Sequence, residues 1–154
     1  DGYLFETGIK ILEKYNLHGI GFVKTGAFDD FTIFDSPNFE LQSHTDKMHV
    51  AGKCPKETSY QQGGGILCLK ESTVMNDLKT SRDKLNGAIA LAYPFYDYNE
   101  RAIKLVEKAG FKLAFIGANG VSGRATPGIN TFKVPRMTIW NTTTFETFKN
   151  YVNN

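Results

Sequence analysis

The sequence predicts an α/β protein with a parallel sheet or an incomplete (β/α) barrel. Short apolar runs of strand length alternate with stretches of helical period, which is the pattern of βα units. Only four or five strands are predicted, whereas the usual parallel barrel has eight. With 154 residues and 41% hydrophobic content, the chain has enough apolar side chains for one core. We therefore expect a single domain over residues 1–154, with the first strand of the barrel missing.

Five segments have the length and composition of strands: 18–23, 39–43, 88–93, 113–116 and 137–140. The second segment alternates apolar and polar side chains, as a half-buried strand does. The third and fourth are almost continuously apolar, which is typical of a strand covered on both faces. All five are short enough to be strands rather than buried helices.

Four stretches repeat apolar side chains with the helical period: about 6–15, 71–85, 100–109 and 145–152. Ser72 is a candidate N-cap of the second helix. Asn99 is expected to cap the third helix, and Gly110 to end it. The last helix is expected to begin after Thr143 or Thr144. It has three apolar residues on one face: Phe145, Phe148 and Val152.

Charge and hydropathy limit the classes of partner. The net charge is +2, and the lysines and arginines are scattered, so the electrostatic footprint of a nucleic-acid binder is missing. We therefore expect no nucleic-acid partner. The stretch contains no run of 18 apolar residues and no recognisable signal peptide, so it is expected to contain no transmembrane segment.

The segment His44-Thr45-Asp46-Lys47-Met48-His49 holds two of the three histidines and directly follows a predicted strand. Ligands and catalytic groups usually lie at the ends of strands in barrels and open α/β sheets, so the pair suggests a metal. A polar loop without a ligand is the alternative. On an α-helix, residues five apart point about 140° away from each other. A chelating pair therefore needs a loop or a π-bulge.

Two cysteines, Cys54 and Cys68, flank a glycine-rich stretch. A bridge between them would close a loop of about fifteen residues and would stabilise the fold by roughly 3 kcal/mol. The alternative is that both thiols are free. We expect the bridge, because it would suit a flexible insertion in a secreted protein.

Five motifs, in order along nearly the whole chain, resemble those of the polysaccharide deacetylases, the NodB-homology domain of carbohydrate esterase family four. These are Asp1-Gly2-Tyr3, residues 40–45 with Ser-His-Thr, residues 92–99 with Tyr-Pro-Phe, residues 110–115, and Val134-Pro135-Arg136-Met137. No motif is decisive alone, but the order of the five is specific. The resemblance implies a distorted barrel of the deacetylase type.

The resemblance also implies a site for zinc or another divalent metal ion, with Asp1, His44 and His49 as the ligands. An Asp-His-His set leaves positions open for water and for a substrate carbonyl oxygen, as catalytic zinc sites do. The backbone N–H of Phe95, the residue after the motif's proline, is expected to stabilise the oxyanion. Three residues are expected to contact the sugar: Tyr93, Pro94 and Trp140. Trp140 could instead belong to the core.

Departures from the family pattern concern catalysis. The family's general base is the first Asp of an Asp-Asp pair, and this sequence begins at the second, so the base and its strand are expected upstream of Asp1. Ala92 stands where many members have an arginine, and Arg136 is the candidate substitute. Tyr96 replaces a glycine. The late histidine that supplies the general acid is absent, because His18 is predicted in a strand far from the site. We therefore expect weak activity from this stretch alone.

The favoured function is a metal-dependent hydrolase that removes acetyl groups from a polysaccharide of the cell wall or an exopolysaccharide that contains N-acetylglucosamine. One alternative is a non-catalytic carbohydrate-binding or cell-wall-associated domain with the same fold, and another is a deacylase of a non-sugar substrate. The expected location is extracellular, or attached to the cell wall or membrane. A sheet edge left open by a missing strand also predicts a homodimer through that edge.

Overall fold

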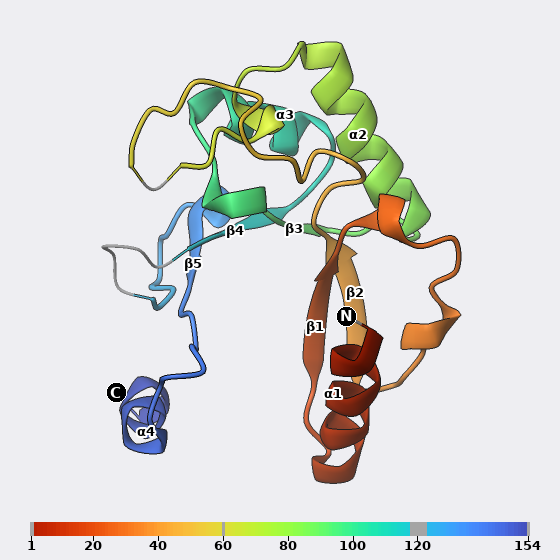
Figure 1. The fold of residues 1–154 in the computed structure, drawn as a ribbon, viewed down its shortest axis with the longest axis vertical. Coiled ribbons are helices and arrows are strands. Elements are labelled where there is room, and N and C mark those ends of the chain that lie inside the picture. Colours follow the sequence, from red (N-terminus) through yellow and green to blue (C-terminus); the bar gives the residue numbers. More distant parts are fainter. Residues whose placement is uncertain (1, 60, 118–122, 154) are drawn as a thin grey trace.

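The computed structural model describes residues 2–59, 61–117 and 123–153. The helices are α1 (Gly2–Tyr15), α2 (Glu71–Lys84), α3 (Glu100–Lys108) and α4 (Phe145–Asn153). The strands are β1 (Gly19–Val23), β2 (Phe39–Ser43), β3 (Ala90–Ala92), β4 (Leu113–Gly117) and β5 (Val134–Arg136). Figure 1 shows these elements along the chain.

The five strands form one parallel sheet in the order β1-β2-β3-β4-β5. Sequential order in a parallel sheet is the arrangement of a barrel, and β1 and β5 lie at the two edges of the described sheet rather than next to each other. The predicted α/β class with an incomplete barrel is therefore confirmed. The shortest pairing in the described sheet is between β2 and β3, where the register contains the single pair Ser43–Leu91.

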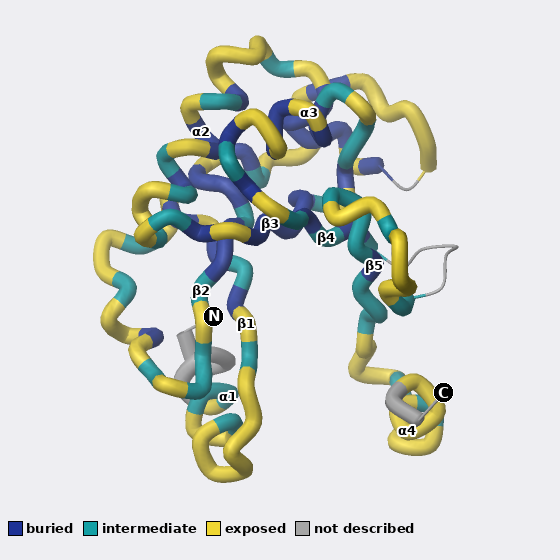
Figure 2. Tube along the Cα trace, turned by 180° about the vertical axis from the view of Figure 1, so that it is seen from behind, coloured by how far each residue is buried: buried dark blue, intermediate teal, exposed yellow. Residues whose placement is uncertain are grey.

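The hydrophobic core lies between α2, α3 and the strands β3 and β4 (Figure 2). Fully buried side chains of both helices, such as Val74, Leu78 and Val106, pack there with Leu91 and Ala114. The core is therefore concentrated in one half of the molecule. It holds the carboxyl ends of β2 and β3 in place, which is where the candidate site lies.

Helix α3 begins and ends where the sequence predicts. The side chain of Asn99 accepts a hydrogen bond from the N–H of Ala102 at 2.9 Å, and Gly110 has a φ of +96° just after the helix. Both predictions are confirmed. The predicted cap at Ser72 is wrong, because α2 begins one residue earlier, at Glu71, and Lys70 precedes it without a side-chain cap. Helix α1 begins at Gly2 rather than Glu6, since no proline interrupts residues 2–5.

The predicted strand at 137–140 is wrong, and the sheet ends with β5 instead. The register ends at the pair of Gly117 with Arg136, and residues 137–140 pair with no strand among the described residues. Pro135 fits this place because an edge strand needs no N–H on its outer side.

Helix α4 begins after Thr144, whose hydroxyl accepts a hydrogen bond from the N–H of Thr147 at 3.1 Å. Its expected apolar face is not buried: Phe145 is 73% exposed and Phe148 is 42% exposed. The third residue of that face, Val152, lies outside the described side chains. Figures 1 and 2 show α4 standing apart from the sheet, so the helix has amphipathic spacing without a partner surface in the described part of the chain. No helix within the described ranges is long and apolar enough to cross a membrane.

Candidate active site

A pocket of about 280 Å³ lies at the carboxyl edge of the sheet. Its lining comes from the ends of four strands and the turns that follow them: Phe22, His44, His49, Ala92, Tyr93, Phe95, Tyr96 and Arg136. Active sites of parallel α/β folds lie at this edge. Most of the residues predicted from sequence therefore meet in one place, although they are distant along the chain.

The two histidines lie side by side in this pocket. Their ring centroids are 4.8 Å apart, and the ring of His49 lies 4.1 Å from that of Phe95. The Nδ1 of His44 is 2.8 Å from the carbonyl oxygen of Ala92, so in the neutral tautomer Nδ1 donates to this carbonyl. Burial lowers the pKa of His44 to about 4 and also lowers the pKa of His49. Both rings are therefore neutral near pH 7, which is the form that binds metals.

The histidine pair fits a divalent metal ion. Because Nδ1 of His44 is engaged with a backbone carbonyl, Nε2 is left as an electron-pair donor, which is the usual arrangement of a metal-bound histidine. Among the described residues, no group of three His, Cys, Asp or Glu side chains is placed to hold a metal. The predicted third ligand, Asp1, lies outside the described residues. The described part of the chain thus places two imidazole side chains, a ligand type common in zinc sites, side by side.

The turn between the histidines, residues 44–49, is an irregular loop and not a helix. The N–H of His44 donates to the carbonyl of Val23 at 2.8 Å, and the N–H of Thr25 donates to the carbonyl of Thr45 at 3.1 Å. The turn is therefore attached to the end of β1. Thr45 has a φ of +71°, a conformation that is unusual for a β-branched residue.

The turn after β3 is strained. Phe95 and Tyr96 both have left-handed backbone angles, with φ of +57° and +61°. Two successive residues of this kind are costly for side chains other than glycine, and such strain is concentrated at functional sites. The family's glycine at the position of Tyr96 has an explanation here, since a left-handed residue is required.

Arg136 lies between two aromatic rings at the edge of the pocket. Its guanidinium carbon is 5.4 Å from the ring centroid of Phe22 and 5.8 Å from that of Tyr96. Burial lowers the pKa of Arg136, and its Nε has no hydrogen-bond partner among the described residues. A half-buried cation with an unused donor is suited to a carboxylate or another anion.

The residues expected to contact the sugar are placed differently from one another. Tyr93 lines the pocket but is fully buried, and its hydroxyl donates to the carbonyl of Phe132 at 3.2 Å. Pro94 is buried at the start of the strained turn. Trp140 is 64% exposed, so it is not a core residue, and it does not line the pocket.

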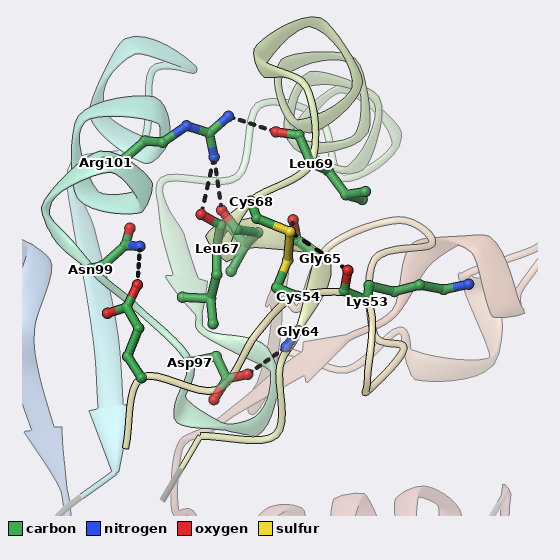
Figure 3. The surroundings of a disulfide bond; sticks show 12 residues. Lys53, Cys54, Gly64, Gly65, Leu67, Cys68, Leu69, Asp97, Asn99 and Arg101 are labelled. Atoms are coloured by element: carbon green, nitrogen blue, oxygen red, sulfur yellow. Dashed lines mark hydrogen bonds between the residues drawn. A yellow bond between two sulfur atoms is a disulfide. The ribbon is translucent and has the colours of Figure 1, made fainter. Parts of the chain in front are cut away.

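Cys54 and Cys68 form a disulfide in the structure (Figure 3). The loop that they close is held by two further residues of the same region. The buried carboxylate of Asp97 accepts a hydrogen bond from the N–H of Gly64 at 2.6 Å, and Arg101 of α3 donates to the carbonyls of Ile66 and Leu67 at 3.3 and 3.4 Å. Asp97 thus has a structural role, and the loop is anchored next to the strained turn.

Sequence reasoning missed three residues that support the histidine turn: Asp77, Ser81 and Lys84. They are spaced four and three residues apart on α2, so they share one face of that helix. The signal that could have found them is a polar stripe next to the apolar residues Val74 and Leu78 on a helix predicted to be half-buried.

Comparison with solved structures identifies the fold of this chain. No protein-family model matches the chain. The structure resembles a de-N-acetylase from Aggregatibacter actinomycetemcomitans with a TM-score of 0.70 and 15% identity, over 96% of this chain and 70% of the other. It resembles IcaB from Ammonifex degensii with a TM-score of 0.72 and 14% identity, over 98% of this chain and 68% of the other. The chain thus has the fold of the polysaccharide deacetylases, as predicted.

The curated proteins that are similar in sequence carry a more specific name than the structural neighbours. The chain is 24% identical to the poly-beta-1,6-N-acetyl-D-glucosamine N-deacetylase of Staphylococcus aureus strain MRSA252, over 90% of this chain and 51% of that protein. The enzyme of the same name from Staphylococcus epidermidis is also 24% identical, over 92% of this chain and 52% of that protein. The chain spans about half the length of the curated relatives it matches. The resemblance seen in the motifs is confirmed by these relatives.

Proposed function

We propose that the chain acts in the metal-dependent removal of acetyl groups from a polysaccharide of N-acetylglucosamine. The observation that carries this proposal is the pair of neutral imidazoles, 4.8 Å apart between ring centroids, in the pocket at the carboxyl edge of the sheet. The names of the curated relatives support the polymer and the N-acetyl group as substrate.

In this proposal His44 and His49 hold zinc or another divalent ion, and Asp1 is the third ligand. Such an ion polarises a carbonyl oxygen and lowers the pKa of a bound water to near 7. The carbonyl of Ala92 orients the ring of His44, so that its Nε2 faces away from that hydrogen bond. Burial keeps the ring neutral and available as a ligand.

Two further residues are proposed to act in the reaction: Phe95 and Arg136. The backbone N–H of Phe95 is proposed as the donor to the oxyanion, which is consistent with the contact between the Phe95 ring and His49. Arg136 is proposed to bind a carboxylate through its Nε, which is buried and has no hydrogen-bond partner among the described residues. The aspartate expected upstream of Asp1 as general base would be such a carboxylate.

The proposed location is extracellular, or attached to the cell wall or membrane. A disulfide between Cys54 and Cys68 is favoured in such an oxidising compartment. A polysaccharide of the cell surface would be reached there.

The test compares metal content and acetate release in three proteins. We expect wild type, incubated with Zn²⁺ and freed of excess ion, to retain about one equivalent, and the double variant His44→Ala, His49→Ala to retain none. The matched control is His18→Ala, which alters the exposed third histidine and should retain the metal. Residues 1–154 alone are expected to release little acetate, so activity is measured on the protein extended upstream to include the expected general base, where acetate release from β-1,6-linked N-acetylglucosamine oligomers should follow the metal content. Metal binding by that extended protein without acetate release from any acetylated glycan would favour a carbohydrate-binding role instead.

A further inference from the structure

Helix α2 contacts the histidine turn and Ser43, the residue just before it, through three polar side chains, which we call the α2 clamp: Asp77, Ser81 and Lys84. The first two are buried, with 9% and 0% of their surface exposed. A carboxylate is rarely buried unless its oxygens are hydrogen-bonded. The partners of this carboxylate therefore indicate what it does.

Asp77 binds two successive backbone N–H groups of the turn. Its Oδ1 accepts from the N–H of Asp46 at 2.8 Å, and its Oδ2 accepts from the N–H of Lys47 at 2.7 Å. Hydrogen bonds to a carboxylate are roughly twice as strong as those between neutral groups. One side chain thus fixes the orientation of two successive peptide groups in the middle of the 44–49 turn.

The other two members of the clamp hold the start of the turn. The hydroxyl of Ser81 is 2.6 Å from that of Ser43, which in turn accepts from the N–H of Thr45 at 3.1 Å. Lys84 donates to Oδ1 of Asp46 at 2.8 Å. The turn is therefore attached to α2 at its first residues and at its centre.

The turn needs such support for a geometric reason. Residues five apart do not share a face of a helix, so regular backbone hydrogen bonding cannot bring His44 and His49 together. The left-handed angle of Thr45 is unfavourable by itself, and it persists only where surrounding contacts impose it. The N–H groups of Asp46 and Lys47 would otherwise be free to turn toward other acceptors.

We infer that Asp77 is a positioning residue for the metal site, because it holds the two-histidine turn in the conformation that brings both imidazoles together. This inference rests on the proposed function, since it assigns Asp77 a role in metal affinity. The residue does not touch the metal or substrate, and it acts through the backbone of Asp46 and Lys47.

The experiment measures Zn²⁺ affinity by competition with a chromophoric chelator. It compares wild type with Asp77→Asn, in which one of the two acceptor oxygens becomes an amide nitrogen. The matched control is Asp83→Asn, the same change at an exposed site on the same helix. Loss of an indirect supporting partner typically weakens metal binding by about 10- to 100-fold, and we expect at least about tenfold for Asp77→Asn. Asp83→Asn should bind like wild type.

A folded Asp77→Asn protein, as judged by urea unfolding, that binds Zn²⁺ as tightly as Asp83→Asn would overturn the inference. If Asp77→Asn does not fold, Ser81→Ala is measured instead, and an unchanged affinity in that variant would overturn the clamp. If wild type binds no Zn²⁺, the proposed function fails, and the clamp is judged by hydrogen exchange. In that case the backbone amides of Asp46 and Lys47 must exchange faster in Asp77→Asn than in wild type, whereas the amides of β3 must exchange at the wild-type rate.

Discussion

Replacing Asp97, whose carboxylate binds the disulfide loop from the turn after β3, by alanine should destabilise the protein strongly. The carboxylate is fully buried and accepts from the N–H of Gln62 at 2.9 Å and from that of Gly64 at 2.6 Å. Each hydrogen bond to a charged group contributes about 1.5–3 kcal/mol. Gln62 is exposed and can bind water instead, whereas Gly64 is buried and keeps an unsatisfied donor. The net loss should be about 2–4 kcal/mol.

The assay is urea unfolding of the oxidised protein, followed by far-ultraviolet circular dichroism. Asp97→Asn keeps one acceptor and should fall between wild type and Asp97→Ala. The control Asp83→Asn, which changes an exposed carboxylate, should alter the free energy of unfolding by less than about 0.5 kcal/mol. A loss below about 1 kcal/mol for Asp97→Ala would refute the argument, because it would mean that the loop finds other acceptors at little cost.

Three further predictions concern titration, the disulfide and the core. Burial lowers the pKa of His44 from its ordinary 6.5 to about 4, so between these values the unfolded chain takes up a proton that the metal-free folded protein does not. The free energy of unfolding should therefore fall as the pH falls through this window, less steeply in His44→Ala; a His44 that titrates near 6.5 by NMR would contradict this. The double change Cys54→Ser, Cys68→Ser opens a loop with a sequence separation of 14 and should lower stability by roughly 3 kcal/mol in urea unfolding. A loss under about 1 kcal/mol would show that Asp97 and Arg101 suffice to hold the loop. Leu78→Ala removes a fully buried side chain and should cost about 2–5 kcal/mol in the same assay, whereas Leu17→Ala, at a site 54% exposed, should cost far less; equal effects would disprove the assignment of the core.

Elements with local signals were predictable from the sequence. The alternation at 39–43 predicted β2, and the apolar runs predicted β3 and β4 to within about two residues. Asn99 and Gly110 marked the ends of α3 because a cap and a left-handed residue depend on neighbours in sequence. Arg136 could be assigned to the same site as His44 only through the resemblance to the family's motifs, and the structure brings the two together because β2 and β5 end at the same edge of the sheet.

Features that depend on partners distant in sequence were not predictable. Residues 137–140 have strand composition, but β4 ends at the pair Gly117–Arg136, so the strand lies at 134–136 instead. Helix α4 has an apolar stripe, yet burial of Phe145 requires a surface that the described residues do not provide. The role of Asp77 depends on the N–H groups of a turn about 30 residues away, and no local pattern reports such a contact.

The side chain of Tyr96 makes two distant positions of the chain interdependent. A Cβ atom added at Gly117 would lie 2.7 Å from Cγ of Tyr96, which no real Cβ contact allows. Position 117 can therefore carry a side chain only if the ring of Tyr96 moves or is removed, and Arg136 would then lose the present contact with one of its two aromatic neighbours. A glycine at position 96 would remove this steric constraint. We expect the two positions to co-vary among related sequences, and Gly117→Ala to be tolerated better in a Tyr96→Gly background than in wild type.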